Sequence, residues 1–139
     1  MIKVKHIDHV AIAVSDMDEA VRKLGGMFGL RATALEHVSA QKTDVVFLHP
    51  EGDSAVELIC PSGNEGLQRF VDKRGGGLHH ICFEVDDLTA ALADLKASGV
   101  RLIDEVPRVG ARGHLVAFLH PSATGGVLFE LCQKGEDHR

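Results

Sequence analysis

Apolar and polar residues alternate with a period of two along several short segments, and this alternation predicts β-strands. The first segment, Ile7–Val14, alternates in this way, and a second, His79–Val85, does the same. Each predicted strand leads into a run with helical spacing. The first helix is predicted to start behind Ser15, which forms a capping-box pattern with Asp18, and to run to about Phe28.

A second helix follows the second of these strands. Either Asp86 or Asp87 can cap its N-terminus, and Ser98-Gly99 ends it after about Ala97. Short apolar runs bounded by turn residues predict three further strands behind each helix. These strands are Arg31–His37, Asp44–Leu48 and Ala55–Cys60 in the first half of the chain, and Arg101–Val106, Leu115–Leu119 and Gly126–Cys132 in the second.

The two halves of the chain resemble each other. A shift of 71 positions sets His9 on His80, and it sets the FLHP run of residues 47–50 on the FLHP run of residues 118–121. Glu57 falls on Glu130 when two more positions are allowed for a longer turn. We therefore interpret the fold as α+β, built from two βαβββ modules.

The module boundaries follow from this repeat. We expect one domain over residues 1–139, with module 1 over about residues 1–63 and module 2 over about residues 78–139. A short helix at Asn64–Lys73 and a glycine linker at Gly75–Gly77 would connect the modules across residues 64–77.

Strand alternation assigns four ionisable residues to faces opposite the predicted core: His9, His80, Glu57 and Glu130. Two imidazoles and two carboxylates suit a divalent ion such as Co, Ni, Zn or Mn, with open positions for a chelating substrate. A lone histidine on a strand is more often structural. A buried glutamate without a partner is costly, however, and both glutamates lie in apolar strands. The two-fold repetition therefore favours a metal site.

Composition narrows the classes of function. The chain has 139 residues, of which 45% are hydrophobic and 25% charged, which excludes a disordered chain. The net charge is −5 and there is no Trp or Tyr, so we expect neither a nucleic-acid partner nor a membrane surface. Three cysteines without paired spacing and a charged N-terminal strand indicate a cytoplasmic protein without a targeting or membrane-spanning segment.

The segments DHVAIAV, GLHHICFEVDDL, FLHP and GGVLFEL resemble the vicinal oxygen chelate (glyoxalase/bleomycin resistance) superfamily, and within it the methylmalonyl-CoA epimerases. The resemblance extends over nearly the whole chain. It implies a cupped, open mixed sheet around one divalent ion, with cobalt as the expected metal, in a homodimer that binds a small-molecule acyl-CoA. Carried over by position, the implied ligands are His9, Glu57, His80 and Glu130.

The resemblance also implies a reaction. The ion would stabilise the enolate formed when C2 of the acyl group loses its proton, and Glu130 would be one base. Epimerisation needs proton exchange on both faces of C2. The family's second glutamate position, counted back from the VVF run, falls on Ala40, which cannot carry a proton. Glu36, His37 and Asp44 lie nearby as substitutes.

Two other functions stay open from the sequence. A glyoxalase I-type lyase acting on a thiol adduct would use similar ligands, and a binding or resistance module would hold a small molecule without chemistry. The VGARGH run of residues 109–114 is read equally as a plain turn or as a loop beside the substrate, contacting it through Arg112 or His114.

Overall fold

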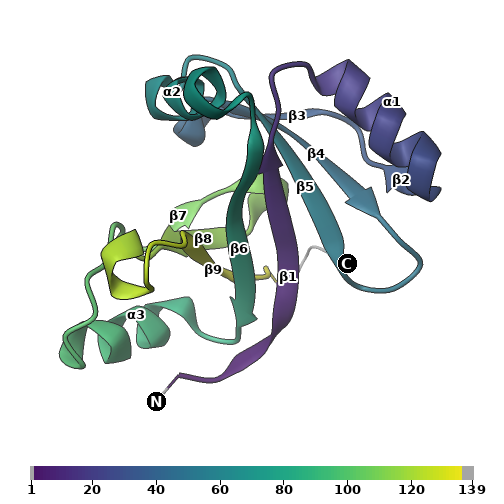
Figure 1. Cartoon of the computed structure of the whole chain (residues 1–139). Helices are drawn as coiled ribbons and strands as arrows, with labels where there is room; N and C mark the ends of the chain where they lie inside the picture. The colour runs from purple at the N-terminus through teal and green to yellow at the C-terminus, as the bar shows by residue number, and fades with distance from the viewer. Residues whose placement is uncertain (1, 136–139) are drawn as a thin grey trace. The chain divides into compact units, whose positions relative to one another are not determined.

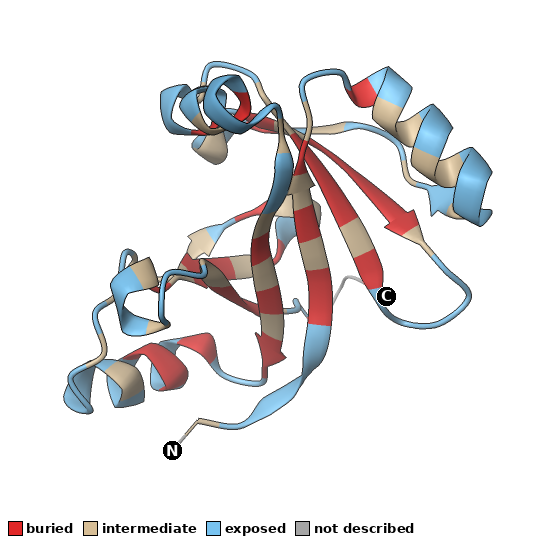
Figure 2. Cartoon of the chain, viewed as in Figure 1, coloured by how far each residue is buried: buried red, intermediate tan, exposed pale blue. Residues whose placement is uncertain are grey.

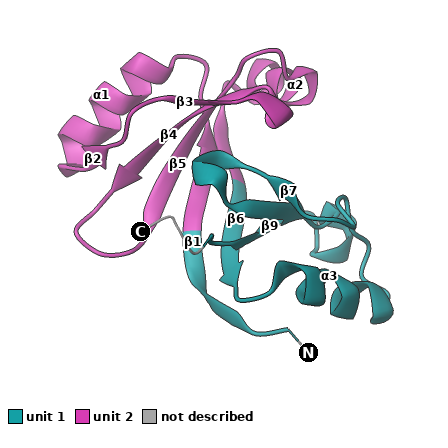
Figure 3. Cartoon of the chain, turned by 180° about the vertical axis from the view of Figure 1, so that it is seen from behind, with its two compact units in different colours: residues 1–8, 80–139 teal, residues 9–79 magenta. Residues whose placement is uncertain are grey.

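The computed structural model describes residues 2–135, which fall into two compact units. Unit 1 comprises residues 1–8 and 80–139, and unit 2 comprises residues 9–79 (Figure 3). Each unit contains a mixed sheet with a helix packed on one face, so the α+β class and the repeated βαβββ order are confirmed. Among residues 2–135, no helix has the length and apolar character that crossing a bilayer requires.

Unit 2 contains the first βαβββ arrangement, drawn from purple to blue in Figure 1. Its strands lie in the order β2-β4-β5-β1, and β3 also pairs with β4. The β1–β5 pair is parallel, whereas β2, β3 and β5 are antiparallel to β4. The elements are β1 (Val4–Ala13), α1 (Met17–Phe28), β2 (Arg31–Ala32), β3 (Glu36–Val38), a 3-10 turn (Ser39–Gln41), β4 (Thr43–His49), β5 (Ala55–Pro61) and α2 (Glu65–Arg74).

Unit 1 repeats this arrangement, with its strands in the order β6-β9-β8-β7. The β6–β9 pair is parallel, and the β8–β9 and β7–β8 pairs are antiparallel. The elements are β6 (Gly77–Val85), α3 (Leu88–Ala97), β7 (Arg108–Val109), a 3-10 turn (Ala111–Gly113), β8 (Leu115–Phe118), a second 3-10 turn (Pro121–Ala123) and β9 (Phe129–Gln133).

The predicted cap of α1 is wrong, whereas Asp87, one of the two caps predicted for α3, is confirmed. Asp16, not Ser15, caps α1, because its carboxylate accepts a hydrogen bond from the backbone N–H of Glu19. Asp87 caps α3 in the same way through the N–H of Ala90. An aspartate directly before each helix therefore satisfies one of the unpaired N-terminal donors.

Several predicted strands were wrong in extent; β9, for example, begins at Phe129 and not at Gly126. Residues 101–106 do not form a strand: Leu102 makes one isolated bridge to Leu119, and the N–H groups of Ile103 and Asp104 both donate to the carbonyl of Phe118. Two donors on one carbonyl bend the chain away from a ladder. The predicted strand Arg31–His37 is interrupted between β2 and β3.

Each unit has its own apolar core under its helix. In unit 2, Met17 of α1 packs on Val46, Leu48 and Leu58. In unit 1, the core residues are Val85, Leu88, Ala91, Leu92, Ala117, Leu119 and Leu131. Figure 2 shows the alternation of buried and less buried positions along β1 and β6. On β1 the less buried Ile12 packs on the α1 core, whereas the buried Ala11 and Ala13 lie on the opposite face.

Candidate functional site

In unit 2, a histidine and a glutamate meet on the sheet face opposite α1. His9 Nε2 lies 3.4 Å from Glu57 Oε1, and the side chains are 4% and 8% exposed. Phe47 pairs with Glu57 across β4 and β5, and its ring contacts His9 edge-on with ring centroids 5.7 Å apart. The phenyl ring therefore holds the imidazole beside the carboxylate.

Unit 1 repeats this arrangement. His80 Nε2 lies 3.3 Å from Glu130 Oε1, and the side chains are 4% and 6% exposed. Phe118 pairs with Glu130 across β8 and β9, and its ring contacts His80 edge-on with centroids 5.1 Å apart. All four predicted ligands are thus buried, and each unit brings one histidine and one glutamate together.

Two phenylalanines, Phe47 and Phe118, contact these histidines and were not among the site residues predicted from the sequence. Phe118 follows Phe47 by the same 71 positions that separate His80 from His9. The doubled FLHP run carries this signal, because its first residue is Phe47 in one copy and Phe118 in the other. The structure gives the first letter of the run a role as the support of each imidazole.

The donor atoms of each pair fit a shared divalent ion. A nitrogen and an oxygen that are each about 2.1 Å from one metal lie about 3.0–3.5 Å apart for octahedral to tetrahedral angles. The observed separations, 3.4 Å and 3.3 Å, lie in this interval and exceed a normal N–H···O hydrogen bond. Both Nε2 atoms are buried. Either pair could therefore supply two ligands to an ion of the kind that imidazole and carboxylate prefer.

Two thiols lie beside the pair of unit 1. Cys82 pairs with Glu130 across β6 and β9, and Cys82, Cys132 and Val116 form a small buried cluster on this face. Burial raises the pKa of the Cys82 thiol well above its ordinary value, and a hydrogen bond with Cys132 and the nearby Glu130 charge act in the same direction. The thiol is therefore kept in its neutral form next to the two predicted ligands, His80 and Glu130.

Unit 1 also contains a largely buried ion network, and the charge of its Asp8 contributes to raising the pKa of Cys82. Asp8 is only 2% exposed, and Arg112 Nη2 donates to its Oδ2 over 2.8 Å. Lys134 Nζ lies 3.4 Å from Asp8 Oδ1 and 3.2 Å from Glu84 Oε1. Arg112, one of the two residues considered for a substrate contact, is therefore engaged by a carboxylate of its own unit. His114, the other one, is buried.

The charges of this network set the protonation of Glu84 and Lys134. Burial alone would raise the pKa of the Glu84 carboxyl, but the hydrogen bond and charge of Lys134, helped by His6 and Lys5, hold it below its ordinary value. Burial alone would lower the pKa of the Lys134 ammonium, whereas Glu84 and Asp8 raise it above the ordinary value. Both groups are thus held in their charged forms.

The residues near Ala40 divide between the two faces of unit 2. Ala40 itself is exposed on the 3-10 turn. His37 Nδ1 and Asp44 Oδ1 are hydrogen-bonded over 2.8 Å and share the face of Val46, which packs against α1. Glu36 pairs with Val45, so it shares the face of Phe47, and hence of His9 and Glu57.

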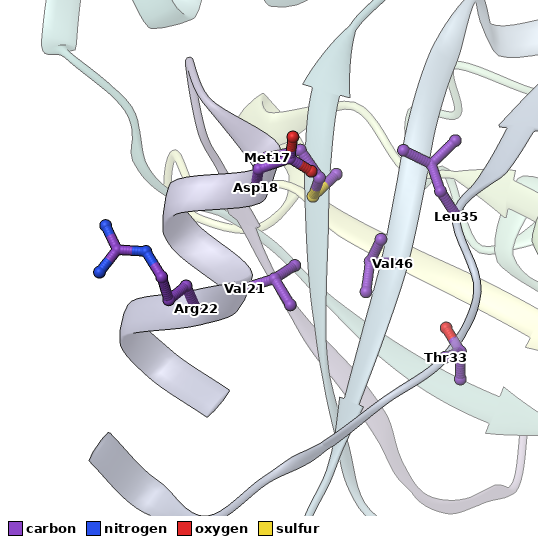
Figure 4. A pocket seen from close by; sticks show the side chains of 7 residues that line it. All are labelled: Met17, Asp18, Val21, Arg22, Thr33, Leu35 and Val46. Atoms are coloured by element: carbon purple, nitrogen blue, oxygen red, sulfur yellow. The ribbon is translucent and has the colours of Figure 1, made fainter. Parts of the chain in front are cut away.

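A pocket of about 280 Å³ lies on the helix side of unit 2 (Figure 4). Val21 of α1 and Val46 of β4 line it, with Asp18 and Arg22 also on its wall. Because Val46 faces α1, this pocket lies on the face opposite His9 and Glu57. It is separate from the candidate ligands.

Residues 8–118 match the Glyoxalase/Bleomycin resistance protein/Dioxygenase superfamily. The human mitochondrial methylmalonyl-CoA epimerase is 39% identical over 91% of this chain and 73% of that protein. The ethylmalonyl-CoA/methylmalonyl-CoA epimerase of Cereibacter sphaeroides is 36% identical over 91% of this chain and 96% of that protein. A variant of the Streptomyces coelicolor methylmalonyl-CoA epimerase, solved in complex with 2-nitronate-propionyl-CoA, has a TM-score of 0.89 and 31% identity, covering 96% of this chain and 99% of that one. The chain belongs to the glyoxalase/bleomycin resistance protein/dioxygenase superfamily, and within it to the family of the methylmalonyl-CoA epimerases.

Proposed function

We propose that this protein is a metal-dependent epimerase that acts at C2 of methylmalonyl-CoA or a closely similar acyl-CoA. The observation that carries the proposal is the repeated contact of a buried histidine with a buried glutamate, His9 with Glu57 and His80 with Glu130. Family membership supports it, since relatives that span this chain carry epimerase names. One of the similar structures holds an acyl-CoA analogue.

The two pairs hold one divalent ion in this proposal, with cobalt as the expected metal. Nε2 of His9 and of His80 and one oxygen each of Glu57 and Glu130 are the ligands. A divalent ion held there would polarise the thioester carbonyl of the substrate and so acidify the proton on C2. The same donor set is compatible with Zn, Ni or Mn, so the choice of cobalt is a prediction about the purified protein.

Glu130 is the proposed base for one face of C2. The C2–H bond breaks, the proton goes to the carboxylate, and the electron pair stays on the substrate as its conjugated carbanion. Oε1 of Glu130 faces His80, so we assign proton transfer to its other oxygen. The carboxylate is 6% exposed, which limits competing exchange with bulk water.

Inversion at C2 requires a proton from the opposite face, and we assign that role to Glu36. Of the three candidates near Ala40, Glu36 alone shares a sheet face with His9 and Glu57. His37 and Asp44 are hydrogen-bonded to each other on the other face. A neutral Glu36 would donate the proton to the planar carbanion, and its carboxylate would accept a proton in the reverse direction.

The cellular compartment and the oligomeric state are proposed on separate grounds. All three cysteines are free thiols, which suits the reducing cytoplasm. Met27 and Phe28, adjacent residues at the end of α1, are 69% and 64% exposed, and apolar side chains that form a contiguous exposed patch mark contact surfaces. We propose a homodimer, and sedimentation equilibrium with a double Met27→Ser, Phe28→Ser variant tests whether this surface forms it.

Proton exchange at C2 of methylmalonyl-CoA, measured in deuterated water with cobalt-loaded protein, tests the proposed function. We expect deuterium to enter C2 and the two epimers to interconvert, and both processes to stop when a chelator removes the ion. Absence of exchange with a filled metal site would overturn the proposal and favour a thiol-adduct lyase or a binding module. A parallel assay with a glutathione hemithioacetal separates these two outcomes.

A further inference from the structure

Arg108 has a fixed position on the face of unit 1 that carries the histidine–glutamate pair. It pairs with Val116 across β7 and β8, and directly paired residues of antiparallel strands share a face. Its guanidinium carbon lies 6.0 Å from the centroid of the Phe118 ring, the same ring that contacts His80 edge-on. One phenyl ring thus contacts both a ligand imidazole and a guanidinium.

Asp104 fixes the orientation of that guanidinium. Its Oδ2 accepts a hydrogen bond from the backbone N–H of Phe118 over 2.9 Å, and its Oδ1 lies 3.2 Å from Arg108 Nε. The Asp104 side chain is 16% exposed and that of Arg108 is 38% exposed. Arg108 Nε is buried and has no hydrogen-bond partner among residues 2–135, so Asp104 orients the guanidinium through its charge at ion-pair distance.

Within residues 2–135, Asp104 is the one carboxylate at ion-pair distance from Arg108. It meets Nε, which leaves the two terminal nitrogens of the planar fork for a further acceptor. Such a fork matches a carboxylate through two parallel hydrogen bonds, and because Asp104 and Phe118 already hold it, little side-chain entropy is lost on binding.

We propose that Arg108 binds the free carboxylate of the acyl group and selects malonyl-type thioesters over simple acyl thioesters. This inference rests on the proposed function, since it assumes an acyl-CoA beside His80 and Glu130. The carboxylate is the feature that separates methylmalonyl-CoA from propionyl-CoA. A cation fixed beside the ligand pair of unit 1 is a direct means of recognising it.

The same fork could also bind a phosphate of the CoA moiety. A binding experiment with two acyl-CoA ligands distinguishes a contact to the carboxylate from a contact to a phosphate. Malonyl-CoA and propionyl-CoA carry the same phosphates, but only malonyl-CoA carries the carboxylate. A side chain that binds the carboxylate favours malonyl-CoA over propionyl-CoA, whereas a side chain that binds a phosphate contributes equally to both.

Calorimetric titration of the cobalt-loaded protein with malonyl-CoA and with propionyl-CoA tests the inference. We expect Arg108→Met to weaken binding of malonyl-CoA by about 10- to 100-fold, as expected for lost hydrogen bonds to a charged group, and to leave propionyl-CoA binding unchanged. Equal weakening of both ligands would overturn the inference in favour of a phosphate contact, and no change for either would reduce Arg108 to a structural residue. If the unmodified protein failed to bind malonyl-CoA, the proposed function would fail together with it.

Two companion variants separate recognition from folding. Arg108→Lys keeps the charge but loses the fork, so its malonyl-CoA affinity should fall between those of the unmodified protein and Arg108→Met. The double variant Asp104→Asn, Arg108→Met leaves no carboxylate without its cation and should bind as Arg108→Met does. Arg101→Met, at an exposed position of the same unit, is the control for loss of a positive charge. Equal binding by the Lys and Met variants would contradict bidentate recognition.

Discussion

Glu36 and Arg108 occupy equivalent register positions in the two units. Glu36 pairs with Val45 and Arg108 pairs with Val116, and Val116 follows Val45 by the repeat distance of 71 residues. The histidine–glutamate–phenylalanine arrangement is the same in both units, but this flanking position carries a carboxylate in one unit and a guanidinium in the other. The residues that repeat in both units are the proposed metal ligands. The position at which the units differ carries the two residues to which we assign proton transfer, Glu36, and anion recognition, Arg108.

Metal content provides the first prediction. If the two pairs share one ion, the purified protein should hold one ion per chain, and His9→Ala and His80→Ala should each abolish most of the binding. Loss of a direct ligand should lower the affinity for the ion by more than the factor of about 10–100 that is lost when a residue hydrogen-bonded to a ligand is removed. Elemental analysis after dialysis measures this, with His37→Ala as the control. Two ions per chain, with each variant losing one, would contradict a shared site.

Glu130 and Glu57 should differ in their effect on the reaction although both are predicted ligands. Glutamine keeps a carbonyl oxygen that can bind an ion but cannot accept the C2 proton. We expect Glu130→Gln to slow C2 exchange by about 10²–10⁴-fold at saturating cobalt, and Glu57→Gln to slow it much less. Single-turnover deuterium incorporation measures both. Equal losses in the two variants would assign Glu130 to the ion alone.

Glu84 should make stability depend on pH. Its lowered pKa means that its carboxylate stabilises the folded state above the ordinary glutamate pKa, and that this contribution is lost as the pH falls through the lowered value. We expect Glu84→Gln to reduce the free energy of unfolding by about 1–3 kcal/mol at pH 7, and by progressively less below about pH 4. Urea unfolding at several pH values measures the difference. A difference that grew in acid would contradict the role of Lys134 as its partner.

The sheet faces of the four proposed ligands could be predicted from sequence because the side-chain period of a strand is two. An error of a few residues in a strand end leaves the face of each side chain unchanged, so the late start predicted for β1, at Ile7 instead of Val4, did not affect His9. Repetition then confirmed the same face in the second half. The sequence therefore predicted the sheet face of each of these side chains correctly, although several predicted strand ends were wrong.

Other features could not be read from local pattern. Arg112 and Asp8 are 104 positions apart, and no periodicity relates an N-terminal strand to a glycine-rich turn. The alternation of residues 101–106 resembles a strand, yet Asp104 uses its side chain to hold Phe118 and Arg108. These contacts depend on which strands become neighbours, and only the fold determines that.

The assignment of Glu36 gives the last prediction. Glu130 alone can remove and return a proton on one face of C2, so Glu36→Gln should retain deuterium exchange but slow the interconversion of epimers by about 10²–10⁴-fold. His37→Ala is the matched control, because His37 is the neighbouring residue on the opposite face and should leave both rates unchanged. Chiral analysis of the acyl group, run beside the exchange assay, separates the two rates.

Ala40 tests the same assignment from the other direction. It is exposed on the 3-10 turn, so a glutamate there can be accommodated without burying a charge. In the Glu36→Gln background, Ala40→Glu should restore part of the lost epimerisation, because a carboxylate returns to the position that the family resemblance gives to the second base.

Unchanged epimerisation in Glu36→Gln would assign the second proton to another group, and single substitutions at His37 and Asp44 would then find it. If Glu36→Gln epimerised normally and the added Ala40→Glu made epimerisation faster, the carboxylate at residue 40 would supply an additional proton-transfer path. Glu36 would then not be the second base. The pair of variants therefore distinguishes a relocated base from an absent one.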